Sequence, residues 1–132
     1  MLEGYITRLI AWTKLKARLH LVVKERVYFK EREIWWISLG TNIGYEQDGK
    51  NKNFERPILV LRKFNKHLFL GLPLTTKNKL GPYYYHYAHE GAVYSVMLWQ
   101  LRTMSSKRLL RKIRMMPQKE FNEIRERVKK LI

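Results

Sequence analysis

The sequence of 132 residues contains no cysteine. This absence excludes disulfide bonds, thiolate zinc sites and a cysteine nucleophile, and it fits a reducing compartment such as the cytoplasm. Long apolar runs are also missing, because uncharged runs such as residues 91–101 are too short to span a bilayer. Charged residues scattered through the first 20 positions leave no apolar core for a signal peptide. We therefore expect a protein without a membrane segment.

Acidic residues are scarce. The 11 Asp and Glu face 27 Lys and Arg, which gives a formal net charge of +16. Such an excess favours a polyanionic partner, most commonly nucleic acid, with an anionic membrane surface or an acidic protein as the alternatives. The four histidines and the few acids show no metal-ligand spacing, and no phosphate-loop or serine-nucleophile motif is present. We expect no metal and no cofactor.

Residues 1–30 read as a basic helical arm that precedes the main domain, residues 31–132. Apolar side chains recur in the arm at spacings of three and four, which predicts one apolar helix face. These side chains are Tyr5, Leu9, Trp12, Leu15 and Leu19. We expect this face to pack on the main domain rather than on a membrane or a partner, and an extended segment to follow at 21–23.

The main domain shows short strand patterns separated by turn residues. Strands are expected at 34–39, 57–61, 68–74, 83–89 and 93–98, with a closing segment at 113–116. Ser105 is expected to cap a short helix through Leu110, and Pro117 to open a last helix. The apolar stripe of that last helix is Phe121, Ile124, Val128 and Leu131. Five or six strands with helices at the ends predict a mainly β, α+β domain built on a small, partly closed barrel.

The polar loop at 44–49 is a candidate ligand-binding segment because glycines bracket it. Tyr45 has a ring that can stack on a base, Glu46 can accept a proton or read a base edge, and Gln47 can hydrogen-bond a base. The alternative is an ordinary solvated turn.

Arg56 and the end of the third expected strand are candidate phosphate-binding positions. A guanidinium at a strand start can hold a phosphate through two donors, although Arg56 could instead form a surface ion pair, for instance with Glu55. Hydroxyls beside lysines make a plausible phosphate cradle, although an ordinary strand end followed by a basic loop is the alternative. These residues are Thr75, Thr76, Lys77 and Lys79.

The tyrosine-rich strand offers two further possibilities. Tyr83, Tyr85, Tyr87 and His89 are expected on one face, with Tyr84, His86 and Ala88 on the other. The tyrosines could stack on unpaired bases, or they could form core or dimer contacts. His86 and His89 are candidates for proton transfer, although both could be structural.

Five sequence blocks in one order resemble the MazF/PemK toxins. They are residues 33–37 (EIWWI), 44–49 (GYEQDG), 56–60 (RPILV), 73–76 (PLTT), and 100–103 (QLRT) followed by 107–109 (KRL). No block is specific alone, but their order and compatible spacing from residue 33 to the end make the resemblance strong. It implies an SH3-like barrel of the MazF/PemK/CcdB type with a C-terminal helix, here with an N-terminal helical extension.

The resemblance also implies a function. MazF/PemK toxins are homodimeric, metal-independent endoribonucleases that cut single-stranded RNA by attack of the 2′-hydroxyl and are silenced by an antitoxin, which we expect to be acidic. The positions that match their catalytic residues are Arg56 and Thr75, with Glu46, His86 and His89 as possible bases. The expected RNA-binding residues are Tyr45, Glu46, Gln47, Thr76, Lys77 and Lys79.

Two positions depart from a pattern that some family members use. Where those members carry an Arg and an acid before the QLRT-like block, this chain has Met97 and Trp99. The alternative functions are a nucleic-acid-binding module without catalysis on the same barrel and a toxin that poisons gyrase.

Overall fold

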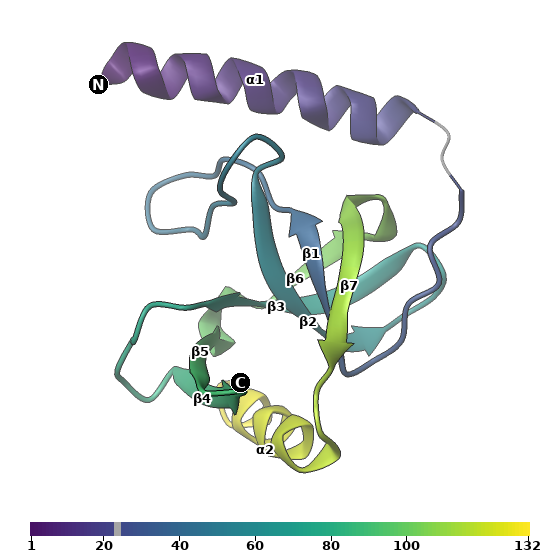
Figure 1. The fold of residues 1–132 in the computed structure, drawn as a ribbon, viewed down its shortest axis with the longest axis vertical. Coiled ribbons are helices and arrows are strands. Elements are labelled where there is room, and N and C mark those ends of the chain that lie inside the picture. The colour runs from purple at the N-terminus through teal and green to yellow at the C-terminus, as the bar shows by residue number, and fades with distance from the viewer. Residues whose placement is uncertain (23–24) are drawn as a thin grey trace.

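The computed structural model describes residues 1–22 and 25–132, which form two helices and a seven-stranded antiparallel sheet (Figure 1). The helices are α1 (Leu2–Leu21) and α2 (Gln118–Lys129). The strands are β1 (Glu33–Ser38), β2 (Glu55–Lys63), β3 (Leu68–Thr75), β4 (Tyr84–His89), β5 (Ala92–Met97), β6 (Arg102–Ser105) and β7 (Leu109–Met115). Two 3₁₀ turns, η1 (Leu98–Gln100) and η2 (Ser106–Arg108), flank β6.

The strands follow the order β4-β5-β3-β2-β1-β7, and β6 pairs separately with β3. β3 makes this arrangement possible because its first half pairs with β6 and its last two residues pair with β5. Register shifts between β1 and β7 and between β2 and β3 add local twist. Among the described residues the outermost strands β4 and β7 do not pair with each other, so the curved sheet is not closed.

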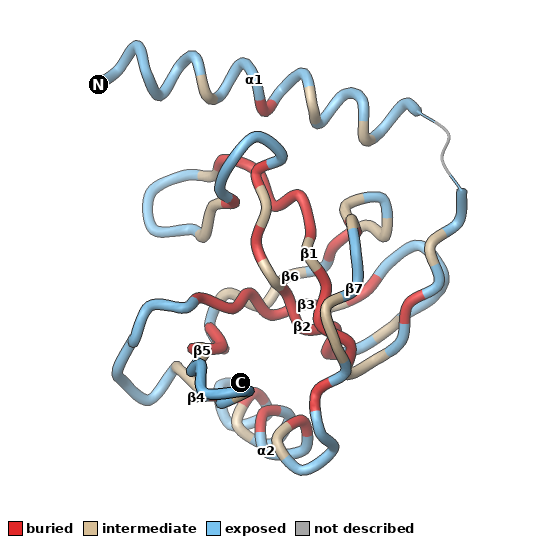
Figure 2. Tube along the Cα trace, viewed as in Figure 1, coloured by how far each residue is buried: buried red, intermediate tan, exposed pale blue. Residues whose placement is uncertain are grey.

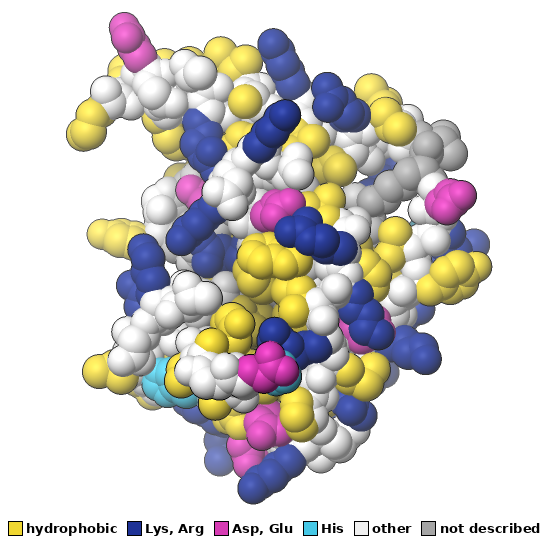
Figure 3. Space-filling model, in the orientation of Figure 1, with side chains coloured by type: hydrophobic (Ala, Val, Ile, Leu, Met, Phe, Trp, Pro, Cys, Tyr) yellow, Lys and Arg dark blue, Asp and Glu magenta, His cyan; other side chains and the backbone are white. Residues whose placement is uncertain are grey.

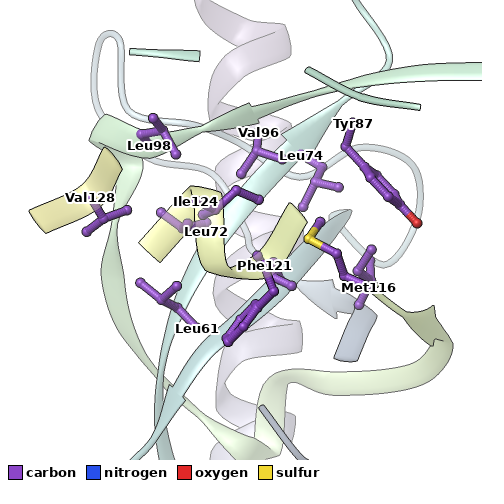
Figure 4. Close-up of a cluster of buried hydrophobic side chains, with 12 residues drawn as sticks. Leu61, Leu72, Leu74, Tyr87, Val96, Leu98, Met116, Phe121, Ile124 and Val128 are labelled. Atoms are coloured by element: carbon purple, nitrogen blue, oxygen red, sulfur yellow. The ribbon is translucent and has the colours of Figure 1, made fainter. Parts of the chain in front are cut away.

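Alternation along the strands produces two apolar clusters, which appear in red along the central strands in Figure 2. In β2, Leu59 and Leu61 enter one cluster while Ile58 and Val60 enter the other. The first cluster includes the α2 side chains Phe121, Ile124 and Val128 (Figure 4). The predicted apolar stripe of α2 is confirmed at these three positions and is wrong at Leu131, which lies beyond the helix and is exposed.

α1 crosses the end of the molecule that carries the loop between β1 and β2, opposite α2 (Figure 1). The predicted packing of this helix on the main domain is confirmed through Trp12, its one buried residue among those described. Tyr5 and Leu9, expected on the packed face, remain 46% and 38% exposed. No helix in the described part of the chain is long and apolar enough to cross a membrane.

Several predicted boundaries need correction. The arm is helical only to Leu21, and of the extended segment expected at 21–23, Val22 is extended while Val23 lies outside the described residues. The helix expected from Ser105 to Leu110 is wrong: Ser105 caps a single 3₁₀ turn by accepting from the Lys107 amide, and Leu109 then pairs with Ile37 as β7 begins. The α+β class with a C-terminal helix is confirmed.

Candidate active site

The β1–β2 loop, residues 39–54, wraps around one end of the sheet. Its two ends are joined where the Phe54 carbonyl accepts from the amides of Leu39, at 2.8 Å, and Gly40, at 3.3 Å. Inside the loop, the Asp48 carboxylate accepts from the Asn42 amide at 2.6 Å, and the Asn42 side chain donates to the Gln47 carbonyl at 2.8 Å. These bonds give the polar segment a defined conformation, which is more order than a solvated turn requires.

Arg56 enters β2 directly beneath this loop and is only 6% exposed. Its Nε donates to the Asp48 carbonyl at 2.6 Å, and Nη1 donates to the Leu74 carbonyl at 3.3 Å. With the Gln47 amide oxygen facing the guanidinium, Nη2 donates to it at 2.7 Å. Since a guanidinium carries five N–H groups, one on each terminal nitrogen has no partner among the described residues.

The alternative of an ion pair between Arg56 and Glu55 is wrong. Alternation along β2 sends the Glu55 side chain to the opposite face, where it forms a two-pronged ion pair with Arg111 at 3.1 Å. Burial lowers the pKa of Arg56, and the nearby Asp48 carboxylate opposes that effect by favouring the charged form. Arg56 is therefore a buried cation held mainly by neutral carbonyl groups.

Thr75 ends β3 beside Arg56, because the Leu74 carbonyl that Arg56 binds is the preceding one. Thr75 is 7% exposed, and its hydroxyl accepts from the Lys77 amide at 3.2 Å. Ser95, the β5 partner of Thr75, holds the same loop by donating to the Lys77 carbonyl at 3.1 Å and accepting from the Lys79 amide at 3.3 Å. The backbone that carries Lys77 and Lys79 is thus fastened to the sheet.

These elements enclose a pocket of about 220 Å³, which we call the Arg56 pocket. It is lined by Tyr45, Gln47, Lys50, Arg56, Thr75, Lys77, Lys79, Tyr84, Met97 and Trp99. The lining holds four cationic side chains and no acid. A cavity with this charge, with a buried arginine and a threonine hydroxyl in its wall, suits a phosphate group.

A larger groove of about 610 Å³ adjoins the Arg56 pocket and shares Tyr45, Gln47 and Trp99 with it. Its other lining residues are Leu39, Asn42, Glu46, Pro73, Gln100, Leu101 and Arg102. The Gln100 side chain ties this wall to the loop by donating to the Tyr45 carbonyl at 3.2 Å. The two cavities together form a polar channel with aromatic side chains at their junction.

Aromatic rings gather at that junction. The Trp99 ring is 52% exposed, stacks on Tyr83 with centroids 6.4 Å apart, and meets Tyr84 edge-on at 5.5 Å. The rest of the tyrosine run serves the fold: Tyr87 is buried in the core, and the Tyr85 hydroxyl donates to Glu123 of α2. Burial and this hydrogen bond raise the pKa of Tyr85.

The structure distributes the remaining predicted site residues as follows. Glu46 lines the larger groove, where its carboxylate also accepts from the Ile43 amide at 2.9 Å. The His86 ring bonds the Lys79 carbonyl at 2.6 Å, behind the loop rather than in the Arg56 pocket. His89 lies at the far end of β4 against Glu90, at 3.6 Å, and Thr76 is exposed outside both lining sets.

Sequence reasoning missed several lining residues. Trp99 and Met97 appeared only as departures from a family pattern, and Lys50, Gln100 and Arg102 were not singled out as site residues. No sequence signal marks Trp99 as a lining residue, because its exposure depends on the fold. No group of three potential metal-ligating side chains occurs within residues 1–22 and 25–132.

Comparison with known proteins identifies a family for most of the chain. Residues 30–132 match the family model described as the PemK-like, MazF-like toxin of type II toxin-antitoxin systems. A search of curated proteins finds no match.

Among solved structures, MazF from Deinococcus radiodurans superposes with a TM-score of 0.64 at 23% identity, covering 80% of this chain and 97% of that one. The MazE-MazF structure from the same organism gives 0.60 at 21%, covering 80% and 96%. An endoribonuclease in complex with its cognate antitoxin from Mycobacterial species gives 0.56 at 13%, covering 76% and 90%. At these identities the superpositions establish the fold.

Proposed function

The chain belongs to the family of PemK-like, MazF-like toxins of type II toxin-antitoxin systems, and from this premise we propose that it is an endoribonuclease that cleaves single-stranded RNA. One of the similar structures is itself described as an endoribonuclease. The observation that carries the proposal is the Arg56 pocket, where four cations, a threonine hydroxyl and no acid surround a space of phosphate-binding character.

The proposed reaction is an internal transesterification. The ribose 2′-oxygen forms a bond to the adjacent phosphorus while the bond from phosphorus to the 5′-oxygen breaks. The products are a 2′,3′-cyclic phosphate and a 5′-hydroxyl, and the proton lost by the 2′-hydroxyl is balanced by the one that the 5′-oxygen gains. The resemblance to metal-independent ribonucleases adds the expectation that EDTA does not stop cleavage.

Arg56 and Thr75 have complementary roles in this proposal. The phosphorane-like transition state carries more negative charge on its oxygens than the substrate does. The two unpaired N–H groups of Arg56 and the hydroxyl of Thr75 would donate to those oxygens from fixed positions in a partly dehydrated cavity. Lys77 and Lys79 would hold the flanking phosphates as point charges.

Glu46 is the strongest of the three candidate bases. Its carboxylate lines the groove that joins the Arg56 pocket, whereas His86 and His89 line neither cavity. Tyr45 and Gln47, at the junction, are suited to contact the bases that flank the scissile phosphate, and Trp99 adds an exposed ring for stacking.

The partners follow from the family. An acidic antitoxin suits a chain of net charge +16, whose Lys and Arg side chains outnumber the acidic ones on the face shown in Figure 3. One of the similar structures is an endoribonuclease in complex with its cognate antitoxin, and another is described as MazE-MazF. We further propose that the protein acts as a homodimer in the cytoplasm, without a membrane partner.

The test compares purified wild type, Arg56→Ala and a matched control, Arg62→Ala, on mixed single-stranded RNA in EDTA. Arg62 lies in the same strand, but its side chain is 63% exposed and lies 3.9 Å from Glu31. Wild type and Arg62→Ala should both cut and leave 5′-hydroxyl ends, while Arg56→Ala should lose about 10²–10³ in rate.

Intact RNA after incubation with folded wild type would refute the ribonuclease proposal. If the folded protein then binds RNA with strong salt dependence, a non-catalytic binding module is the better description. The exposed Trp99 and Tyr83 rings favour that second candidate over gyrase poisoning.

A further inference from the structure

α1 is an addition to the family domain, because the family match begins at residue 30. The helix is anchored by Trp12, which packs on the backbone of Gly40 at the start of the β1–β2 loop. Gly40 has φ +91°, and a Cβ there would lie 2.2 Å from the Trp12 ring, so this contact requires glycine. On its other sides Trp12 meets the Phe54 ring at 5.4 Å and the Arg108 guanidinium at 5.7 Å.

Arg8, one turn before Trp12, holds the same loop at a second point. Its Nη2 donates to the Gly49 carbonyl at 3.0 Å, and its guanidinium lies 4.2 Å from the centre of the Phe54 ring. Gly49 is tightly enclosed, since its amide donates to the Gly40 carbonyl at 2.8 Å and a Cβ would lie 1.7 Å from the Phe54 oxygen. Arg8 therefore acts on a backbone segment that is already confined.

The peptide groups that α1 holds are next to those that hold Arg56. Arg56 Nε donates to the Asp48 carbonyl at 2.6 Å, and Arg8 donates to the very next carbonyl, that of Gly49. The side chain of the preceding residue, Gln47, bonds Arg56 as well. Any displacement of the segment 47–49 would move the acceptors that orient the guanidinium.

We propose that α1 is a positioning element for the candidate active site, and that Arg8 and Trp12 hold the β1–β2 loop so that it orients Arg56. The inference rests on the proposed ribonuclease function. Arg8 lines neither the Arg56 pocket nor the adjoining groove, and its guanidinium is occupied by its contacts with Gly49 and Phe54. Its contribution should therefore appear in the cleavage rate and not in RNA affinity.

The experiment uses the full chain as wild type, Arg8→Ala, Arg8→Lys and the control Arg18→Ala. Arg18 is an exposed residue on the same helix, so its removal changes the charge equally without touching the loop. Single-turnover cleavage at saturating single-stranded RNA gives the rate constant, and anisotropy with a 2′-O-methyl RNA of the same sequence gives the affinity. Amide hydrogen exchange at Gly49 reports the order of the loop.

Arg8→Ala should cut about tenfold to a hundredfold more slowly than wild type, with the affinity of Arg18→Ala and with faster exchange at Gly49. Arg18→Ala should stay within about twofold of wild type in rate. Arg8→Lys should fall between wild type and Arg8→Ala, because an ammonium can make one of the two contacts. Trp12→Ala should slow cleavage at least as much as Arg8→Ala.

Three results would overturn the inference. They are an unchanged rate in Arg8→Ala, a slower rate without faster exchange at Gly49, and an effect confined to RNA affinity and shared with Arg18→Ala. If wild type cuts no RNA, the ribonuclease proposal fails separately. The exchange data then decide the positioning role by themselves: faster exchange at Gly49 in Arg8→Ala than in Arg18→Ala supports it, and equal exchange overturns it.

Discussion

Replacing Thr75 by Val removes one hydroxyl from the Arg56 pocket while nearly preserving side-chain shape. Thr75 is 7% exposed in the pocket wall, beside the Leu74 carbonyl that Arg56 binds. If its hydroxyl donates to a phosphate oxygen that gains charge in the transition state, the loss should be about 2.7–4 kcal/mol, or about 10²–10³ in rate. RNA affinity should change much less, because the ground-state phosphate needs that donor less.

The cost of the same substitution to folding is small. The hydroxyl accepts one hydrogen bond, from the Lys77 amide at 3.2 Å in a partly buried position. Losing it costs about 0.5–1.5 kcal/mol, against the roughly 5–15 kcal/mol that stabilises a typical domain. Thr75→Val should therefore remain folded, which thermal unfolding can verify.

The assay is single-turnover cleavage at saturating RNA, with two controls. Thr75→Ser keeps the hydroxyl and should stay near wild type. Ser95→Ala disturbs the same loop, through the Lys77 carbonyl and the Lys79 amide, but Ser95 is not part of the pocket lining. Cleavage by Thr75→Val within about threefold of wild type, which is less than ~1 kcal/mol, would refute the catalytic role. A comparable loss in Ser95→Ala would show that Thr75 acts by holding the loop.

Three further predictions concern Trp99, Glu46 and Glu33. Trp99→Ala should weaken binding of single-stranded RNA by about 1–3 kcal/mol for the base it stacks on, measured by anisotropy, whereas Trp99→Phe should retain most of the affinity; equal loss in both would argue against stacking. Glu46→Gln should slow single-turnover cleavage by about 10²–10⁴, while His89→Ala should cut normally; the reverse order would exclude Glu46 as the base. Burial tends to raise the pKa of Glu33, but hydrogen bonds from Lys112, the Lys30 amide and Trp35 outweigh it and lower the pKa. Ionised Glu33 should therefore contribute its full share to the free energy of unfolding at pH values above the ordinary carboxyl pKa. This contribution should be lost as the pH falls through the lowered pKa. Denaturant unfolding should show a smaller decline in stability for Glu33→Gln than for wild type, because the other carboxyl with a lowered pKa, Glu55, still contributes its own.

The strands could be predicted from sequence where the local residue pattern and the packing in the folded protein favour the same structure. The β2 region alternates between two apolar clusters and is bounded by polar loops, so both signals point to a strand. The prediction of a helix after Ser105 is wrong because neighbouring residues determine only the first turn there. Ser105 does cap a turn, but Leu109 pairs with Ile37 of β1, more than 70 positions away, and that pairing ends the turn after three residues.

The candidate site was predictable only in part, for a similar reason. Arg56, Thr75 and the polar loop lie close to one another because β2 and β3 are neighbours, so sequence blocks could indicate them. Which partner Arg56 takes depends on the face of the strand, which assigns Glu55 to Arg111 and turns Arg56 toward Asp48 and Leu74. Trp99 lines the same cavities as Tyr45 because of the path of the chain through β4 and β5, which no local pattern reveals.

Met97 and Trp99 bear on two parts of the proposed function, the binding of a phosphate in the Arg56 pocket and the removal of a proton from the RNA. Met97 and Trp99 give the Arg56 pocket an apolar wall, and no carboxylate lines it. An apolar wall lowers the local dielectric and strengthens the attraction between a phosphate and Arg56. The absence of a lining acid also means that no carboxylate in the pocket wall competes with the phosphate for the four lining cations. Because no carboxylate lines the Arg56 pocket, the base of the proposed reaction would have to act from the adjoining groove, where Glu46 lies. A site of this kind should hold RNA firmly in variants that have lost cleavage, and the separation of affinity from rate is therefore the informative measurement for every residue in it.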